Sequence, residues 1–288
     1  MSSAHPSSRG AVLLVTAMAF FSVSDALAKY LSATLSPFTL AWFRYMMLLA
    51  TALPLAVMRP RIWRTSKPLL QVARAASVVG SALLFMWGLK VLPVAEATAM
   101  VFASPLFVTL LSTVLLREVV PWPRWIPVSL GFVGVLIVVR PGFSGFGGAE
   151  MFPILPSVAW AISIVVTRQL SGADSSATTM LYTGVLGATG LTLLLPPLDM
   201  AVVMAQAHWL VVMGVFWCTG QWLTIAAYRA ASAAEIAPFA YSQLMWATLL
   251  GLVVFRHVPD FISLLGMAVI VASGLLAAWQ TRMASASD

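Results

Sequence analysis

The sequence predicts an all-α integral membrane protein with ten transmembrane helices, arranged as two inverted five-helix repeats. Three observations predict this fold: the composition, a succession of ten apolar segments, and an internal repeat. Of the 288 residues, 61% are hydrophobic and 9% are charged, whereas an ordinary soluble domain carries about 25% charged residues. So few charges cannot cover a protein surface in water, and we expect the chain to lie in a lipid bilayer.

The ten segments follow from the length that a membrane span requires. A helix needs about 20 mainly apolar residues to cross the hydrocarbon layer. Dividing the chain where charged residues, Pro, Gly or Ser interrupt the apolar runs gives 10–31, 37–58, 69–89, 93–115, 124–140, 151–170, 176–195, 209–228, 232–255 and 261–280. The connections between segments are too short to hold an extramembrane catalytic domain.

The first segment also imitates a cleavable signal peptide. A basic residue precedes its apolar run, and the small residues Ala26-Leu27-Ala28 resemble a cleavage site. Cleavage would leave nine spans. We favour retention, because this region has a counterpart later in the chain.

The basic residues predict the orientation in the membrane, since cytoplasmic loops carry more Lys and Arg. With a cytoplasmic N-terminus, eleven fall on the inner side: Arg9, Arg59, Arg61, Arg64, Lys67, Arg74, Arg117, Arg124, Arg168, Arg229 and Arg282. Four fall on the outer side: Lys29, Lys90, Arg140 and Arg256. We therefore expect a multi-pass protein of the bacterial inner membrane, with both termini in the cytoplasm.

The second half of the sequence repeats the first at a constant offset of 139. Residues 102–111 align with 241–250, Glu96 aligns with Glu235, and Ser24 aligns with Ser163. Because five spans are an odd number, the second repeat must enter the membrane from the opposite side. We expect one repeat in 1–141, the other in 150–281, and a short cytoplasmic tail in 282–288. Inverted repeats are typical of secondary transporters that work by alternating access.

Three short motifs carry a family resemblance. They are Pro105-Leu106-Phe107 in the fourth segment, Leu116-Arg117-Glu118 at its end, and the Gly-rich stretch 131–135 in the fifth. With the ten inverted spans, the chain resembles the EamA-type transporters of the drug/metabolite transporter superfamily. It departs from their pattern in the second half, where Leu244 replaces the proline and Arg256-His257 replaces the Leu-x-Glu ending.

The resemblance implies a transporter rather than an enzyme. It implies export of small metabolites, amino acids above all, through a central cavity lined by helices 1, 3, 4, 6, 8 and 9, with the other helices as scaffold or dimer surface. The deep aromatic, Gln and Ser positions favour aromatic or bulky apolar amino acids. The alternatives are a multidrug or lipophilic-cation efflux transporter and, remotely, an intramembrane enzyme acting on lipid-linked substrates.

From the sequence we expect few partners other than the substrate and the bilayer. The basic residues are not clustered beside a polar face, so we expect no nucleic acid. The single cysteine and three dispersed histidines offer no metal site, and we expect no cofactor. Protons remain a possible coupling ion, and the oligomeric state stays open.

Polar and aromatic residues deep in the spans are candidates to line the cavity. Trp217, Gln221, Thr224 and Tyr228 follow one another at steps of four, three and four, which places them on one helix face. The full set is Ser24, Ser81, Phe85, Met100, Ser104, Trp160, Ser163, Trp217, Gln221, Thr224, Tyr228, Phe239, Gln243 and Trp246. Packing between helices is the alternative interpretation for their hydroxyls and indoles.

Two ionisable residues lie deepest, at matching depths. Asp25 is six residues from the end of the first segment, and Arg44 is seven residues into the second. The simplest interpretation is a structural ion pair, because either charge alone would face a low dielectric. The alternative is that Asp25 couples transport to protons or binds an amine. Pro105 is a possible hinge, since proline interrupts helical hydrogen bonding.

Overall fold

A computed structural model describes residues 6–115, 121–140, 154–170, 173–231 and 236–286. The first half contains α1 (Pro6–Leu31), α2 (Pro37–Met58), η1 (Pro60–Trp63), α3 (Pro68–Val91), α4 (Val94–Val101), α5 (Ser104–Leu115), η2 (Trp122–Arg124) and α6 (Trp125–Val139). Several of these helices begin with proline, whose missing N–H would have no partner in the first turn.

The second half contains α7 (Leu155–Leu170), α8 (Ser176–Leu194), α9 (Met200–Ala205), α10 (Ala207–Ala230), η4 (Ala237–Tyr241), α12 (Ser242–Phe255) and α13 (Phe261–Ala286). Within the described residues, nine helical stretches are long and apolar enough to cross a membrane, and Leu155–Thr167 is a shorter apolar helix. The prediction of an all-helical membrane protein is confirmed. The proposed link between the repeats, 142–149, lies outside the described residues.

The offset of 139 recurs in the helix boundaries. Shifting α3 (residues 68–91) by 139 gives 207–230, which are the bounds of α10. The same shift carries the gap between α4 and α5, at residues 102–103, onto 241–242, where η4 passes into α12. The two halves therefore share element order, and the odd number of crossings in each makes their directions opposite.

The predicted fourth span, 93–115, is not one helix but two. The break comes just after Val101, whose carbonyl is four residues before Pro105 and would meet the proline ring in a continuous helix. The second half breaks at the equivalent place although Leu244 stands where the first half has Pro105, so proline alone does not cause it. Phe102 and Tyr241, which are related by the offset, stack with ring centroids 4.9 Å apart.

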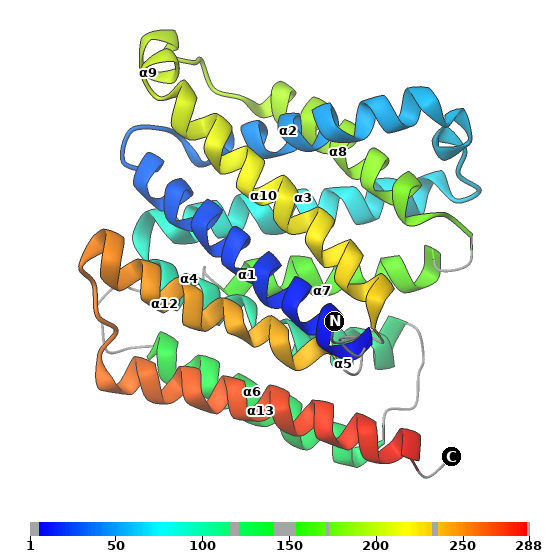
Figure 1. The fold of residues 1–288 in the computed structure, drawn as a ribbon, viewed down its shortest axis with the longest axis vertical. Coiled ribbons are helices and arrows are strands. Elements are labelled where there is room, and N and C mark those ends of the chain that lie inside the picture. Colours follow the sequence, from blue (N-terminus) through cyan, green and yellow to red (C-terminus); the bar gives the residue numbers. More distant parts are fainter. Residues whose placement is uncertain (1–5, 116–120, 141–153, 171–172, 232–235, 287–288) are drawn as a thin grey trace, which may run out of the picture.

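The helices form a central group between two outer pairs (Figure 1). α2 packs on α8, and α6 packs on α13, on opposite sides of the molecule. Between them, α1 packs on α10 and α12, while α7 packs on α3 and α5. The central helices are those that the family resemblance assigns to the cavity.

Glycines allow the outer pairs to approach closely. A Cβ on Gly187 of α8 would lie 2.6 Å from Cδ1 of Tyr45 in α2. A Cβ on either Gly134 or Gly266 would lie 2.8 Å from the carbonyl oxygen of the other, which joins α6 to α13. Small residues at such contacts are typical of membrane helices, where backbones pack closely without a hydrophobic driving force.

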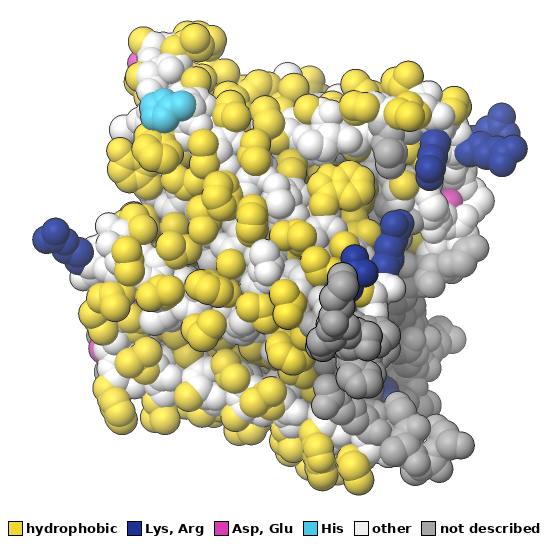
Figure 2. Space-filling model, in the orientation of Figure 1, with side chains coloured by type: hydrophobic (Ala, Val, Ile, Leu, Met, Phe, Trp, Pro, Cys, Tyr) yellow, Lys and Arg dark blue, Asp and Glu magenta, His cyan; other side chains and the backbone are white. Residues whose placement is uncertain are grey.

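The surface fits a bilayer. Figure 2 shows a face covered mostly by hydrophobic side chains, with Lys and Arg toward the two ends of the helices. Large apolar side chains such as Val57, Leu193 and Phe261 are more than two-thirds exposed. Such a surface needs a hydrocarbon solvent.

Candidate functional site

The middle of the bundle contains a buried ion pair between α1 and α2. Nη2 of Arg44 lies 2.9 Å from Oδ1 of Asp25, and each residue is 4% exposed. The same Nη2 donates to Oγ of Ser24 at 2.8 Å, and this hydroxyl donates to the Met213 carbonyl of α10 at 2.9 Å. The pair is therefore held within a seam formed by α1, α2 and α10.

α12 joins this seam through Gln243. Its Nε2 donates to Oδ2 of Asp25 at 3.4 Å, and its carbonyl accepts a bond from the Ser22 hydroxyl at 3.3 Å. Both carboxylate oxygens of Asp25 are thus engaged. Removing either partner of such a pair would leave the other without its partner in a low dielectric.

A second guanidinium lies in another seam, formed by α3, α7 and α8. Nε of Arg74 donates to Oγ1 of Thr167 at 2.9 Å, and Nη1 donates to Oγ1 of Thr183 and to the Thr179 carbonyl. All three acceptors are uncharged. The sequence marked Arg74 as a topology signal and, with Arg44, as one of two bases that could face the cavity. It did not predict these partners, because α7 and α8 are distant along the chain.

Asp174 lies at the inner end of the same seam, before α8. Its Oδ2 accepts bonds from the Thr65 hydroxyl at 2.5 Å and from Nε2 of Gln71 at 2.6 Å. Burial alone would raise the pKa of this carboxyl, but these hydrogen bonds hold it below its usual value. Asp174 therefore stays charged and ties the loop before α3 to the loop before α8.

Several candidate lining residues use their hydroxyls on the backbone. Ser81 donates to the Pro156 carbonyl of the α7 segment at 2.7 Å, which joins α3 to the second half. Ser163 and Thr224 donate to carbonyls in their own helices, those of Trp160 and Gly220. Ser104 and Met100 are buried at the helix break.

The aromatic candidates occupy different surroundings. Trp217 makes an edge contact with the buried Tyr45, with centroids 5.7 Å apart. Trp246 packs beside the Leu14 and Met18 cluster, and its buried indole Nε1 has no hydrogen-bond partner among the described residues. Phe85 packs against the large cluster of the outer half.

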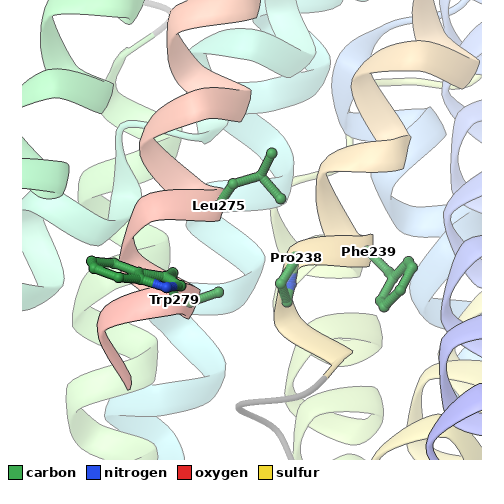
Figure 3. Close-up of a pocket in the computed structure, with 5 residues that line it drawn as sticks. Pro238, Phe239, Leu275 and Trp279 are labelled. Atoms are coloured by element: carbon green, nitrogen blue, oxygen red, sulfur yellow. The ribbon is translucent and has the colours of Figure 1, made fainter. Parts of the chain in front are cut away.

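Other candidates are more open. Trp160, Tyr228 and Phe239 are 38%, 45% and 42% exposed, and Gln221 is partly buried. Phe239 lines a groove of about 290 Å³ with Pro238, Leu275, Ala278 and Trp279, between η4 and the end of α13 (Figure 3). Gln243 instead meets Asp25 of α1. The structure thus brings Ser24, Asp25, Arg44 and Gln243 into one hydrogen-bonded group, which the remaining candidates do not join within the described residues.

The two ends of the bundle differ in packing. In the outer half, the largest cluster joins α1, α2, α3, α4, α8, α10 and α12 through residues such as Leu31 and Leu89. A second cluster, around Val138 and Met267, joins α4, α6, α12 and α13. In the inner half, α1 and α10 form one cluster around Leu14 and Ala227, while α2 and α8 form another around Ala56 and Leu181.

Polar contacts also join the halves at the outer end. Nε2 of His257 in the second half lies 3.3 Å from Oε1 of Glu96 in the first. Within the first half, Nζ of Lys29 donates to the Lys90 carbonyl at 3.4 Å. Arg140 pairs with Asp260. These residues lie at or beside helix ends, on the side that the basic residues assign to the outside.

Comparison with known proteins agrees with this architecture. The EamA-like transporter family matches residues 8–140 and again residues 148–279. A riboflavin transporter of Vibrio cholerae is 31% identical over 98% of this chain and 97% of its own. An S-adenosylmethionine uptake transporter of Rickettsia prowazekii is 24% identical over 92% of this chain and 91% of its own.

A solved crystal structure shares the fold. It has a TM-score of 0.65 and 20% identity, and the match covers 95% of this chain and 98% of the other. The two family matches account for nearly all described helices, and each contains one five-helix repeat. The chain belongs to the EamA-like transporter family, and it is a secondary transporter of small metabolites rather than an enzyme.

Proposed function

We propose that this protein transports a metabolite that combines a ring system with polar substituents, by alternating access between its two halves. The observation that carries the proposal is the end-to-end similarity to transporters named for riboflavin and S-adenosylmethionine. Both compounds contain a heteroaromatic ring system joined to a polar chain. Aromatic side chains with a few amides and hydroxyls suit such a ligand, because rings stack while polar groups orient it.

Amino-acid export is a narrower form of this proposal. Aromatic amino acids share the ring and the polar head, but the relatives' names specify riboflavin and S-adenosylmethionine, and the Rickettsia proteins are named for uptake. The comparisons therefore favour larger heteroaromatic substrates. Because the Rickettsia proteins are named for uptake, the direction of transport must be measured rather than assumed to be export.

The uneven packing of the bundle supports alternating access. α1, α10 and α12 form one group, and α3, α5 and α7 form another. At the outer end, α4 packs on α12, and the Glu96–His257 contact adds a polar link. The inner halves pack into separate clusters. Two helix groups joined more tightly at one end could rock against each other around a central site, which is how alternating access works.

Efflux of lipophilic cations has less support. A site for such cations needs a carboxylate without a protein counter-charge. Asp25 is the candidate for this carboxylate. Asp25 is paired with Arg44 and bonded to Gln243. Displacing Arg44 would leave a second buried charge unpaired.

Uptake into proteoliposomes tests the proposal. The panel contains labelled riboflavin, S-adenosylmethionine, tryptophan and phenylalanine, with loading from either side and with or without a pH gradient. We expect accumulation of at least one ring-bearing compound above empty vesicles. Transport of none of the four contradicts the proposal.

Trp160 provides a matched pair of variants for the same assay. Its side chain is 38% exposed within the central group of helices, whereas Trp122 is 77% exposed at a helix end. If Trp160 stacks on the substrate ring, Trp160→Ala lowers uptake about fivefold, which corresponds to about 1 kcal/mol. Trp122→Ala leaves uptake unchanged. Equal rates for the two variants would remove Trp160 from the site.

A further inference from the structure

The seam around Arg44 and the seam around Arg74 are equivalent positions in the two repeats. Adding 139 to Ser24, Asp25 and Arg44 gives Ser163, Ile164 and Thr183. Adding 139 to Arg74 gives Met213, whose carbonyl accepts the Ser24 bond in the first seam. The first seam combines α1, α2 and α10, and the second combines α7, α8 and α3.

Each seam contains one guanidinium, contributed by a different helix. In the first seam Arg44 comes from α2 and donates to a hydroxyl and to the Asp25 carboxylate. In the second seam Arg74 comes from α3 and donates to hydroxyls and to a carbonyl. Ile164 stands at the position equivalent to Asp25. The second seam therefore has the cation but lacks the carboxylate.

Within the part of the chain that the structure describes, no carboxylate pairs with Arg74. Asp174, in the same region, is bound by Thr65 and Gln71 and interacts electrostatically with Lys67. Arg74 lies six residues after the start of α3, or about 9 Å along the helix. A guanidinium at such depth normally has a counter-charge, because neutral acceptors compensate only part of the cost of removing it from water.

A donor without a hydrogen-bond partner lies beside this seam. Tyr45 is 1% exposed, and its hydroxyl has no hydrogen-bond partner among the described residues. Its ring rests on Gly187, one helical turn beyond Thr183, and both Arg44 and Arg74 act electrostatically on its phenol. A buried O–H without an acceptor is rare in folded proteins. The second seam thus has a cation without a carboxylate, in Arg74, beside a hydroxyl without an acceptor, in Tyr45.

We propose that Arg74, with the Tyr45 hydroxyl, forms a carboxylate-binding site in the second seam, where the equivalent seam has its own carboxylate in Asp25. The carboxylate belongs to the substrate or to a free carboxylate anion. Thr167, which accepts a bond from Arg74, is exposed, so this edge of the seam is open to a ligand. Arginine suits the ligand, because its planar fork matches the two oxygens of a carboxylate.

The substrate-borne form rests on the proposed function and narrows it. S-adenosylmethionine and the aromatic amino acids carry an α-carboxylate, whereas riboflavin carries none. A site for this group therefore favours substrates with an amino-acid head over riboflavin.

Thermal unfolding of the full chain in detergent tests the site itself. Sodium acetate is titrated at constant ionic strength, with neutral acetamide as the matched compound. We expect acetate, and not acetamide, to raise the wild-type Tm in a saturable manner, since a ligand that binds only the folded state stabilises it. Arg74→Gln abolishes this shift and Tyr45→Phe reduces it. Arg64→Gln, which removes an exposed guanidinium, retains it.

A binding comparison identifies the source of the carboxylate. S-adenosylmethionine and its decarboxylated analogue are measured on wild-type protein and on Arg74→Gln. An advantage of about tenfold for the carboxylate form, lost in Arg74→Gln, identifies the substrate's own group. Equal binding of the two compounds together with stabilisation by acetate identifies a free anion. Either result supports the site.

The proposal is overturned if acetate leaves the wild-type Tm unchanged, or if Arg74→Gln shows the same shift as wild type. If Arg74→Gln does not fold, Arg74→Lys and Tyr45→Phe replace it, with a weakened acetate shift as the expected result. Because these readouts measure binding, a protein that binds acetate but transports none of the panel compounds fails the proposed function and not this site.

Discussion

Arg44 and Arg74 occupy equivalent seams of three helices, and the two seams differ at one decisive position. The first has Asp25, which pairs with Arg44 at 2.9 Å. The second has Ile164, and among the described residues Arg74 donates to hydroxyls and a carbonyl but to no carboxylate. The two repeats therefore share a backbone arrangement but carry different charged side chains at equivalent positions. The paired arginine supports the fold, and the other remains available to a ligand.

The largest expected effect comes from breaking the first pair. Asp25→Asn leaves Arg44 buried without its counter-charge, which costs about 3–5 kcal/mol in comparable buried pairs. We expect a large fall in Tm, measured in detergent by the loss of monodisperse protein on heating. The double variant Asp25→Asn/Arg44→Gln recovers part of that loss, because neither charge is then stranded. A double variant less stable than the single one would contradict the ion-pair account.

The converse change adds a carboxylate to the second seam. Ile164→Asp places an acid at the position equivalent to Asp25, where it can pair with Arg74. Ile164→Asn is the matched control without charge. We expect the Asp variant to be more stable than the Asn variant by about 1.5–3 kcal/mol, the usual value of a hydrogen bond to a charged group.

The same pair of variants also bears on the ligand. If the introduced carboxylate occupies the site, the Ile164→Asp protein loses its response to acetate while Ile164→Asn keeps it. An Asp variant that is no more stable than the Asn variant and still responds to acetate would show that the two seams are not equivalent.

These contrasts also show what the sequence can predict. Ten spans follow from hydropathy alone, because the bilayer imposes one length on each apolar segment. The repeat follows from coincident polar residues such as Ser24 and Ser163. The matching depth of Asp25 and Arg44 indicated an ion pair, and the structure places them in contact.

The partners of Arg74 could not be predicted in this way. Hydropathy gives the depth of a residue but not its lateral neighbours, which depend on close contacts such as Gly187 against Tyr45. Thr167 and Thr183 are about a hundred residues away along the chain and belong to the other repeat. The offset of 139, applied to Arg44, would have pointed to Thr183. Only the structure shows that Arg74 fills that seam.

Two equivalent serines give a smaller contrast. Ser24 accepts from Arg44 and donates across to α10, whereas Ser163 donates only to Trp160 in its own helix. Ser24→Ala should therefore cost about 1–3 kcal/mol, and Ser163→Ala close to nothing. Thermal unfolding of the two variants side by side measures the difference. Equal losses would indicate that Ser163 also makes a contact between helices.

The smallest effect concerns an ion pair outside the membrane spans. Asp260 pairs with Arg140 at the outer end, and the hydrogen bond from Arg140 lowers the pKa of Asp260 below its usual value. A carboxyl whose folded pKa is depressed stabilises the fold above its unfolded pKa and loses that effect as the pH falls through the folded value. Because Asp260 is exposed, solvent screens the pair. We therefore expect Asp260→Asn to lower the Tm slightly at pH 7, with the gap to wild type narrowing below about pH 4. If Asp260→Asn lowered the Tm as much as Asp25→Asn does, the exposed pair would stabilise the fold as strongly as the buried pair, which would contradict this account.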